Sequence, residues 1–161
     1  MNSLPSSSGT YALILQLTRP AVLQIGRLGE TSFPAGNYVY LGSAFGPGGL
    51  QARLGRHLRG ESRRHWHIDY LRSAAQVAGF CYAITPVSQE CYWCQALALQ
   101  PGAWIPARGF GASDCRARPR RCPAHLLAFS RPVLATELSK VLALAEDQQV
   151  EAVMLAGAPG E

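Results

Sequence analysis

Five polar side chains between residues 11 and 90 are of the types that phosphodiester hydrolysis uses. They are two tyrosines, an arginine, a histidine and a glutamate: Tyr11, Tyr40, Arg53, His57 and Glu90. Such a reaction needs a water that loses its proton, a positive partner for the phosphate, and help for the leaving oxygen. A tyrosine, an arginine and a metal-bound carboxylate can meet these needs. Because Arg53 and His57 are four residues apart, a helix would let both point at one phosphate.

Each of these residues also has an ordinary structural explanation. Tyr11 and Tyr40 lie in strand-like runs, where aromatic side chains are common. Arg53 and His57 could belong to a solvated helix face. Glu90 could be a first-turn carboxylate favoured by the helix dipole. Taken singly, the structural explanations are favoured.

The hydrophobic pattern predicts the elements that must position these residues. Strands are predicted at 10–17, 21–27 and 37–43, and their succession indicates an antiparallel meander. The first has apolar residues on both faces, which is typical of a central strand. Leucines at 50, 54 and 58 form one stripe of a helix that carries Arg53 and His57 off the stripe. The remaining prediction is a helix at 66–74, a strand at 77–84, a helix at 88–99, a long loop at 100–123, a strand at 125–129 and a helix at 131–147.

These elements predict one α/β domain of the α+β type, with a small, mostly antiparallel central sheet flanked by helices. We expect the domain to occupy 9–148, after a flexible polar leader at 1–8 and before a frayed acidic tail at 149–161. No apolar run approaches the roughly 20 residues that span a bilayer. The first nine residues lack the pattern of a secretory signal. We therefore expect a cytoplasmic monomer without membrane contact.

Positive charge is concentrated in the first part of the chain. Residues 1–131 hold fourteen arginines and five acids, whereas 132–161 hold one lysine and five acids. The preference for arginine favours bidentate phosphate contacts, although genome base composition can also produce it. We expect nucleic acid, DNA in particular, as the partner; on charge alone, an ordinary solvated surface is an equal explanation. The expected contact residues are Arg56, Arg59, Arg63, Arg64, Arg116, Arg118, Arg120 and Arg121.

The cysteines raise the question of zinc. Cys91 and Cys94, with Cys115, Cys122 and His125, have the number and chemistry of a zinc site. Their spacing is not that of two paired CxxC knuckles, and thiols in a helical pattern are common core residues. We therefore expect cysteines that pack in the core, with zinc as the less favoured alternative.

A second polar cluster, HWHIDY, contains His65, His67 and Asp69. These side chains could line a cleft or lock two helices together, and the sequence leaves both open. We assign Asp114, Cys115, Cys122 and His125 in the same way, to the cleft or to structure.

The ordered set of motifs resembles the GIY-YIG nuclease superfamily. GTY at 9–11, YLG at 40–42, Arg53 with His57, and Glu90 follow one another in the order of that superfamily's motifs. GTYALILQL, YVYLGSAFGPGGL, HWHIDYL, GFGASDC and CPAHL resemble more closely its DUF123, or Uri-type, subfamily, over 9–129. The resemblance implies that Tyr40 or Tyr11 orients or deprotonates water, that Arg53 clamps the phosphate, and that Glu90 holds Mg²⁺ or Mn²⁺. With the whole set matched, the functional interpretation of these residues is favoured.

The chain departs from the superfamily pattern in three places. An additional strand separates the first two motifs, as in the DUF123 type. The late asparagine of many members has no counterpart at 91–129; Asp114 or a water could replace it, or catalysis could be weak. The segment RARPRR at 116–121 separates Cys115 from Cys122 and resembles an added phosphate-contacting finger.

The resemblance implies a metal-dependent endonuclease acting on DNA. Without a dedicated recognition domain, we expect it to select substrates by structure rather than by sequence. Two alternatives stay open: a catalytically weak or inactive nucleic-acid-binding module of the same fold, and a zinc-stabilised domain that binds a protein.

Overall fold

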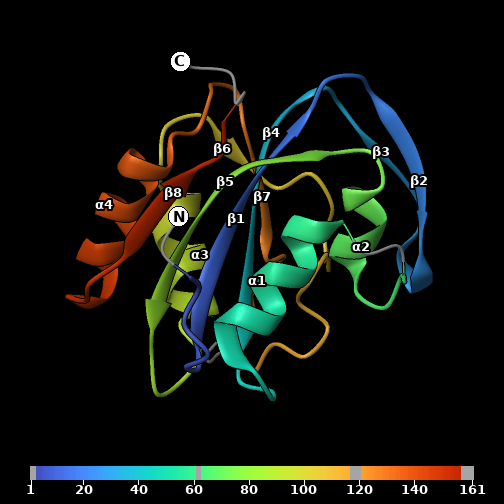
Figure 1. The fold of residues 1–161 in the computed structure, drawn as a ribbon. Coiled ribbons are helices and arrows are strands. Elements are labelled where there is room, and N and C mark those ends of the chain that lie inside the picture. The colour runs from blue at the N-terminus through green and yellow to red at the C-terminus, as the bar shows by residue number, and fades with distance from the viewer. Residues whose placement is uncertain (1–2, 61–62, 117–120, 157–161) are drawn as a thin grey trace.

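Six strands form one antiparallel sheet, in a computed structural model that describes residues 3–60, 63–116 and 121–156 (Figure 1). The sheet order is β6-β7-β4-β1-β5-β8, and every neighbouring pair is antiparallel. The strands are β1 (Gly9–Leu17), β4 (Gly36–Ala44), β5 (Gln76–Ile84), β6 (Ala103–Trp104), β7 (Leu126–Phe129) and β8 (Glu151–Met154). The predicted α/β class, with a mostly antiparallel sheet and flanking helices, is confirmed.

Strand β1 is central, as its apolar pattern predicted. Alternate residues face two separate cores: Leu13 and Leu15 pack in one, Ala12 and Ile14 in the other. Helices α1 (Gly49–Arg59) and α2 (His67–Arg72) cover the first face, and α3 (Glu90–Ala98) and α4 (Ala135–Glu146) cover the second (Figure 1). Polar residues near the start of β1 can therefore point to either face of the sheet, depending on their position in this alternation.

The predicted meander is wrong. Strand β2 (Ala21–Ile25) does not pair with β1; it pairs with β3 (Gly29–Phe33) in a separate two-stranded hairpin. The hydrophobic pattern does not predict β3, because alternate residues of this strand are exposed and its sequence is mostly polar. With the hairpin set aside, β1 pairs directly with β4.

Both chain ends depart from the expected flexible segments. The carbonyls of Pro5 and Ser7 accept hydrogen bonds from the amides of Gln51 (2.8 Å) and Leu50 (3.0 Å), which lie in the first turn of α1 and have no partner within the helix. Pro5 and Ser7 of the expected leader therefore bind the first turn of α1. At the other end, β8 pairs with β5, so the expected frayed tail is wrong for these four residues. The acidic and small residues around these four gave no signal of a short strand.

The predicted loop at 100–123 contains the two-residue strand β6, and the described part of the segment after β6 folds back on itself before β7 begins. The Gly109 amide bonds to the Pro123 carbonyl (2.6 Å), and the His125 amide to the Phe110 carbonyl (2.8 Å). The His125 carbonyl accepts from the Leu41 amide (2.9 Å), which fixes the loop to β4. These bonds bring residues 111–116 to the end of the sheet. Among the described residues, no helix has the length and apolar character needed to cross a bilayer.

Candidate functional site

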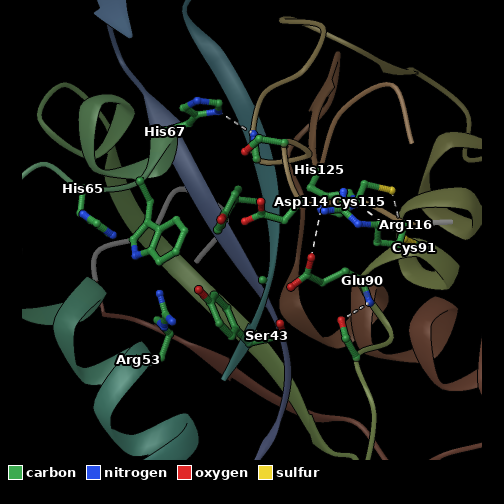
Figure 2. A pocket seen from close by; sticks show the side chains of 17 residues that line it. Ser43, Arg53, His65, His67, Glu90, Cys91, Asp114, Cys115, Arg116 and His125 are labelled. Atoms are coloured by element: carbon green, nitrogen blue, oxygen red, sulfur yellow. Dashed lines mark hydrogen bonds and ion pairs between the residues drawn. The ribbon is translucent and has the colours of Figure 1, made fainter. Parts of the chain in front are cut away.

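A pocket of about 590 Å³ lies at the end of the sheet where β1 begins and β4 ends (Figure 2). It gathers four of the five residues singled out for phosphodiester chemistry: Tyr11, Tyr40, Arg53 and Glu90. Its other lining residues come from β4, the segment before α2, the start of α3 and the loop before β7: Gly42, Ser43, His65, Trp66, His67, Ser88, Cys91, Gly111, Ser113, Asp114, Cys115, Arg116 and His125.

Tyr11 is held by its neighbours on two sides. The register of β1 against β4 places it opposite Gly42, where a Cβ atom would overlap the Tyr11 hydroxyl. Only glycine leaves room there, which gives the last residue of the YLG motif a packing role. On the other side, the Tyr11 hydroxyl lies 2.9 Å from His57 Nε2.

His57 points into the core and does not line the pocket. The buried side of α1 consists of Leu50, Leu54 and His57, at positions i, i+4 and i+7, so His57 lies on the apolar stripe and Arg53 on its flank. The expectation that both residues point at one phosphate is therefore wrong for His57. Burial, and then the charge of Arg56, lower the pKa of His57 to about 4. The ring is neutral at pH 7, so Nε2 can accept the Tyr11 proton.

The hydroxyl of Tyr40 has no protein partner within the part of the chain that the structure describes. Its ring centroid lies 6.4 Å from that of Tyr11 and 6.2 Å from that of Phe110. Burial, reinforced by the Glu90 charge, raises the pKa of Tyr40 above its usual value. Tyr40 thus presents a protonated hydroxyl to the pocket.

Arg53 reaches the pocket rim across an indole. Its guanidinium carbon lies 5.2 Å from the ring centroid of Trp66, which is about one-third exposed. The His65 ring packs against the same indole nearly at a right angle, with ring centroids 4.6 Å apart. Contact with one aromatic face leaves the N–H groups at the guanidinium edge able to point outward.

Asp69 locks α1 to α2 and does not line the pocket. Its Oδ2 lies 2.6 Å from an Arg56 guanidinium nitrogen and also accepts from the amides of His65 (2.8 Å) and Trp66 (2.7 Å). Of the two roles left open for HWHIDY, Asp69 has the structural one, whereas His65 and His67 line the pocket. Arg56 is engaged in this contact, which corrects its assignment to nucleic-acid binding.

Replacing Asp69 with asparagine should lower the free energy of unfolding by about 1 to 3 kcal/mol at neutral pH, because Arg56 loses its charged partner. Burial acts to raise the pKa of Asp69, but the hydrogen bonds from Arg56 and the two amides outweigh it and lower the pKa. The contribution is therefore present above the usual value of 3.8 and is lost as the pH falls through the depressed value. Denaturant unfolding should show the two proteins converging below about pH 4. A difference that does not change with pH would contradict this role.

The other arginines expected to contact nucleic acid are exposed or lie outside the described residues. Arg59, Arg63, Arg64 and Arg121 are exposed; Arg116 is exposed and lines the pocket. Figure 2 shows Arg53 and His65 on one side of the pocket and Arg116 on the other. Arg118 and Arg120 lie outside the described residues.

Thr10, which was not singled out from the sequence, binds the backbone just before α3. Its hydroxyl oxygen accepts from the Gln89 amide (2.9 Å) and lies 3.2 Å from the Thr85 hydroxyl. Alternation along β1 turns Thr10 to the face opposite Tyr11. A threonine between apolar positions of a central strand was the available signal. Thr10 thereby places Glu90 in the first turn of α3.

Glu90 uses one of its two carboxylate oxygens within the protein. Oε2 lies 3.0 Å from His125 Nδ1. Oε1 has no partner among residues 3–60, 63–116 and 121–156. Burial acts to lower the pKa of His125, but the Glu90 carboxylate outweighs it and the pKa is raised. Asp114 is exposed and lines the same pocket.

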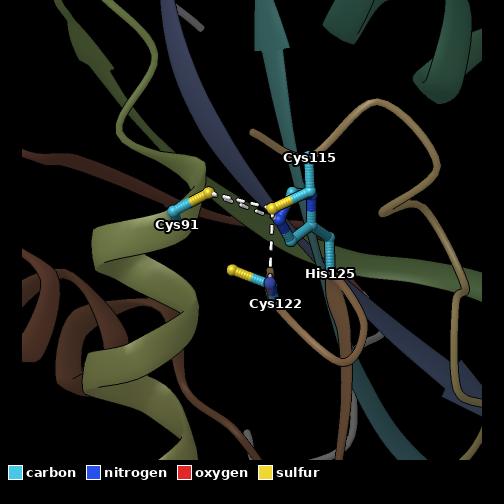
Figure 3. Close-up of side chains that lie close together, drawn as sticks. All are labelled: Cys91, Cys115, Cys122 and His125. Carbon is cyan, nitrogen blue, oxygen red and sulfur yellow. Dashed lines mark hydrogen bonds between the residues drawn. The ribbon is translucent and has the colours of Figure 1, made fainter. Parts of the chain in front are cut away.

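Beside Glu90, four side chains form a group that could bind a metal ion (Figure 3): Cys91, Cys115, Cys122 and His125. Their potential ligand atoms all lie within 4.8 Å of one another. Cys94 is not a member; its Sγ lies 3.0 Å from the Ala124 carbonyl oxygen. The expectation of cysteines that merely pack in the core is therefore too simple, because loop closure brings together residues that are far apart in the chain.

Comparison with known proteins identifies the family. Residues 10–147 match the family described as "Domain of unknown function DUF123", and the chain belongs to it. This confirms the DUF123 part of the resemblance. No curated protein and no solved structure matches the chain.

Proposed function

We propose that this member of the DUF123 family is a metal-dependent endonuclease that hydrolyses DNA phosphodiester bonds and selects substrates by structure. The observation that carries the proposal is the convergence of Tyr11, Tyr40, Arg53 and Glu90, from four separate elements, on one pocket. Their types match the needs of phosphodiester hydrolysis. The resemblance to GIY-YIG nucleases implies the same four residues.

Arg53 is the proposed phosphate clamp. A guanidinium presents paired N–H groups that match two phosphate oxygens, and its charge is permanent. The indole of Trp66 restricts the arginine to the rim, so less conformational freedom is lost when a phosphate binds. The exposed Arg63, Arg64 and Arg116 can continue the contact along the DNA backbone.

The two tyrosines are proposed to orient the attacking water. With the proton of the neutral His57 ring on Nδ1, the Tyr11 hydroxyl donates a hydrogen bond to Nε2, and the oxygen lone pairs of Tyr11 are available to accept from a water. Tyr40 offers a second hydroxyl without a protein partner among the described residues. Burial raises the pKa of both tyrosines, so both hydroxyls are protonated at neutral pH and neither acts as a base. His57 is a weak base because its pKa is lowered, so it orients the Tyr11 hydroxyl by hydrogen bonding and does not take its proton, which makes His57 a positioning residue.

Glu90 is the proposed ligand for a divalent ion. Its Oε1 is available and Asp114 lines the same pocket, a donor set that suits a largely hydrated Mg²⁺ or Mn²⁺. When bound, such an ion would stabilise negative charge on the phosphate and the leaving oxygen.

A nucleic-acid-binding module that cuts little or nothing is the second candidate. One observation favours it: the contact between Glu90 Oε2 and His125 competes with a metal for the same carboxylate. The basic rim is common to both candidates and does not distinguish them.

Cleavage of branched, nicked and single-stranded DNA in Mg²⁺, Mn²⁺ and EDTA tests the proposal. We expect cutting of branched or nicked DNA with either ion, none in EDTA, and binding in all three conditions. Binding to every substrate without cleavage in either ion would favour the second candidate.

A further inference from the structure

We infer that Cys91, Cys115, Cys122 and His125 form a structural zinc site. It is separate from the proposed divalent-ion site at Glu90 Oε1 and does not depend on nuclease activity. The four residues come from α3, from the loop before β7 and from the residue just before β7 (Figure 3).

Two distances within the group are close to those of a tetrahedral zinc complex. With Zn–S near 2.3 Å and Zn–N near 2.0 Å, two sulfurs lie about 3.8 Å apart and a sulfur and a nitrogen about 3.5 Å apart. Cys91 Sγ lies 3.6 Å from Cys115 Sγ and 3.8 Å from His125 Nε2. A disulfide would require about 2.05 Å between sulfurs. The group is therefore spaced for a shared central ion.

His125 has the orientation of a zinc ligand. Its Nε2 faces the cysteine sulfurs, and its Nδ1 faces the Glu90 carboxylate at 3.0 Å. Zinc-binding histidines commonly have a carboxylate beside their second ring nitrogen, which holds the ring in position. The Cys122 amide also donates to Cys115 Sγ (3.3 Å), as expected where a sulfur carries negative charge. Simple packing of thiols requires neither contact.

The donor set selects the metal and the role. Three soft thiolates and an imidazole favour Zn²⁺ over Mg²⁺ or Mn²⁺. Four protein ligands close the coordination sphere, which is typical of a structural site. Since Cys115 and Cys122 lie on either side of 116–121 in the sequence, zinc would hold the chain in place at these two cysteines. It would also tie them to α3 through Cys91.

The metal content of the purified full chain is the first test. We expect about one zinc ion per chain. Cys115→Ser and His125→Asn should lose most of it, whereas Cys94→Ser should keep it. Cys94 is the matched control because it lies on the same helix, one turn from Cys91, outside the ligand group. Co²⁺ in place of zinc should give the visible absorption of a tetrahedral thiolate complex.

Variants that fail to fold are covered by a test on the unaltered chain. Chelation followed by addition of Zn²⁺ alone should raise the melting temperature and protect Cys91, Cys115 and Cys122 from alkylation, with Cys81 and Cys94 unchanged. Absence of both zinc-dependent effects would overturn the site, as would a Cys91–Cys115 disulfide in the freshly purified protein. Neither readout involves DNA cleavage, so a zinc-free nuclease and a zinc-bound protein without activity are distinguishable.

Discussion

Replacing Arg53 with lysine should lower the cleavage rate constant by roughly two to three decades while DNA affinity changes little. Lysine keeps the positive charge but loses the planar pair of N–H groups. If Arg53 stabilises charge that grows on the phosphate during reaction, it acts more strongly in the transition state than in the bound substrate. A loss of about 3 to 4 kcal/mol corresponds to this decrease. Lysine also lacks the planar guanidinium that lies over the Trp66 ring and restricts the position of Arg53.

Single-turnover cleavage at saturating enzyme, together with equilibrium binding in EDTA, measures the two effects separately. Arg19→Lys is the matched control, because Arg19 is exposed, follows the end of β1 that lies away from the pocket, and does not line the pocket. It should leave the rate constant unchanged. If Arg53→Lys instead lowers affinity with an unchanged rate at saturation, Arg53 belongs only to the basic surface, and the binding module becomes the better proposal.

An element was predictable where the pattern of apolar residues along its own sequence shows which of its faces are buried. Apolar residues on both faces identified β1 as central, and the leucine stripe identified α1. Pairing between strands was not readable in the same way. The hairpin of β2 and β3 and the terminal β8 have weak, one-sided patterns that only tertiary contacts stabilise.

Part of the pocket lining was predictable from the order of the motifs along the chain. Tyr11, Tyr40, Arg53 and Glu90 converge as the motif order implied. The direction of His57 was not recognised, because a histidine was assumed to avoid the apolar stripe that it joins.

The sequence pattern indicated the cysteine group only as a less favoured zinc site, with Cys94 included, for a different reason. Its ligands come from positions up to 34 residues apart, and their approach depends on how the loop before β7 folds back on itself. Spacing rules for paired CxxC knuckles do not describe such a group.

Replacing Glu90 with glutamine should abolish most cleavage, by roughly three decades for a loss of about 4 kcal/mol, and leave DNA binding nearly intact. Glutamine keeps the shape of the side chain but removes the charge that would hold a divalent ion. Glu137→Gln is the matched control, since Glu137 is also a first-turn carboxylate, on α4, away from the pocket. Unchanged cleavage in Glu90→Gln would contradict the metal-ligand role.

The contact between Glu90 and His125 makes the same variant informative about zinc. An amide in place of the carboxylate supports the His125 ring less well, so zinc affinity should fall by about 10- to 100-fold, as for other outer-shell partners of zinc-binding histidines. Excess Zn²⁺ should then restore the thermal stability of the variant but not its cleavage, because the ion lost from Oε1 is a different one. Recovery of both by Zn²⁺ would mean that Glu90 acts only through His125. The pocket would then have no carboxylate shown to hold a catalytic ion, and Asp114 would be the remaining carboxylate on its described wall.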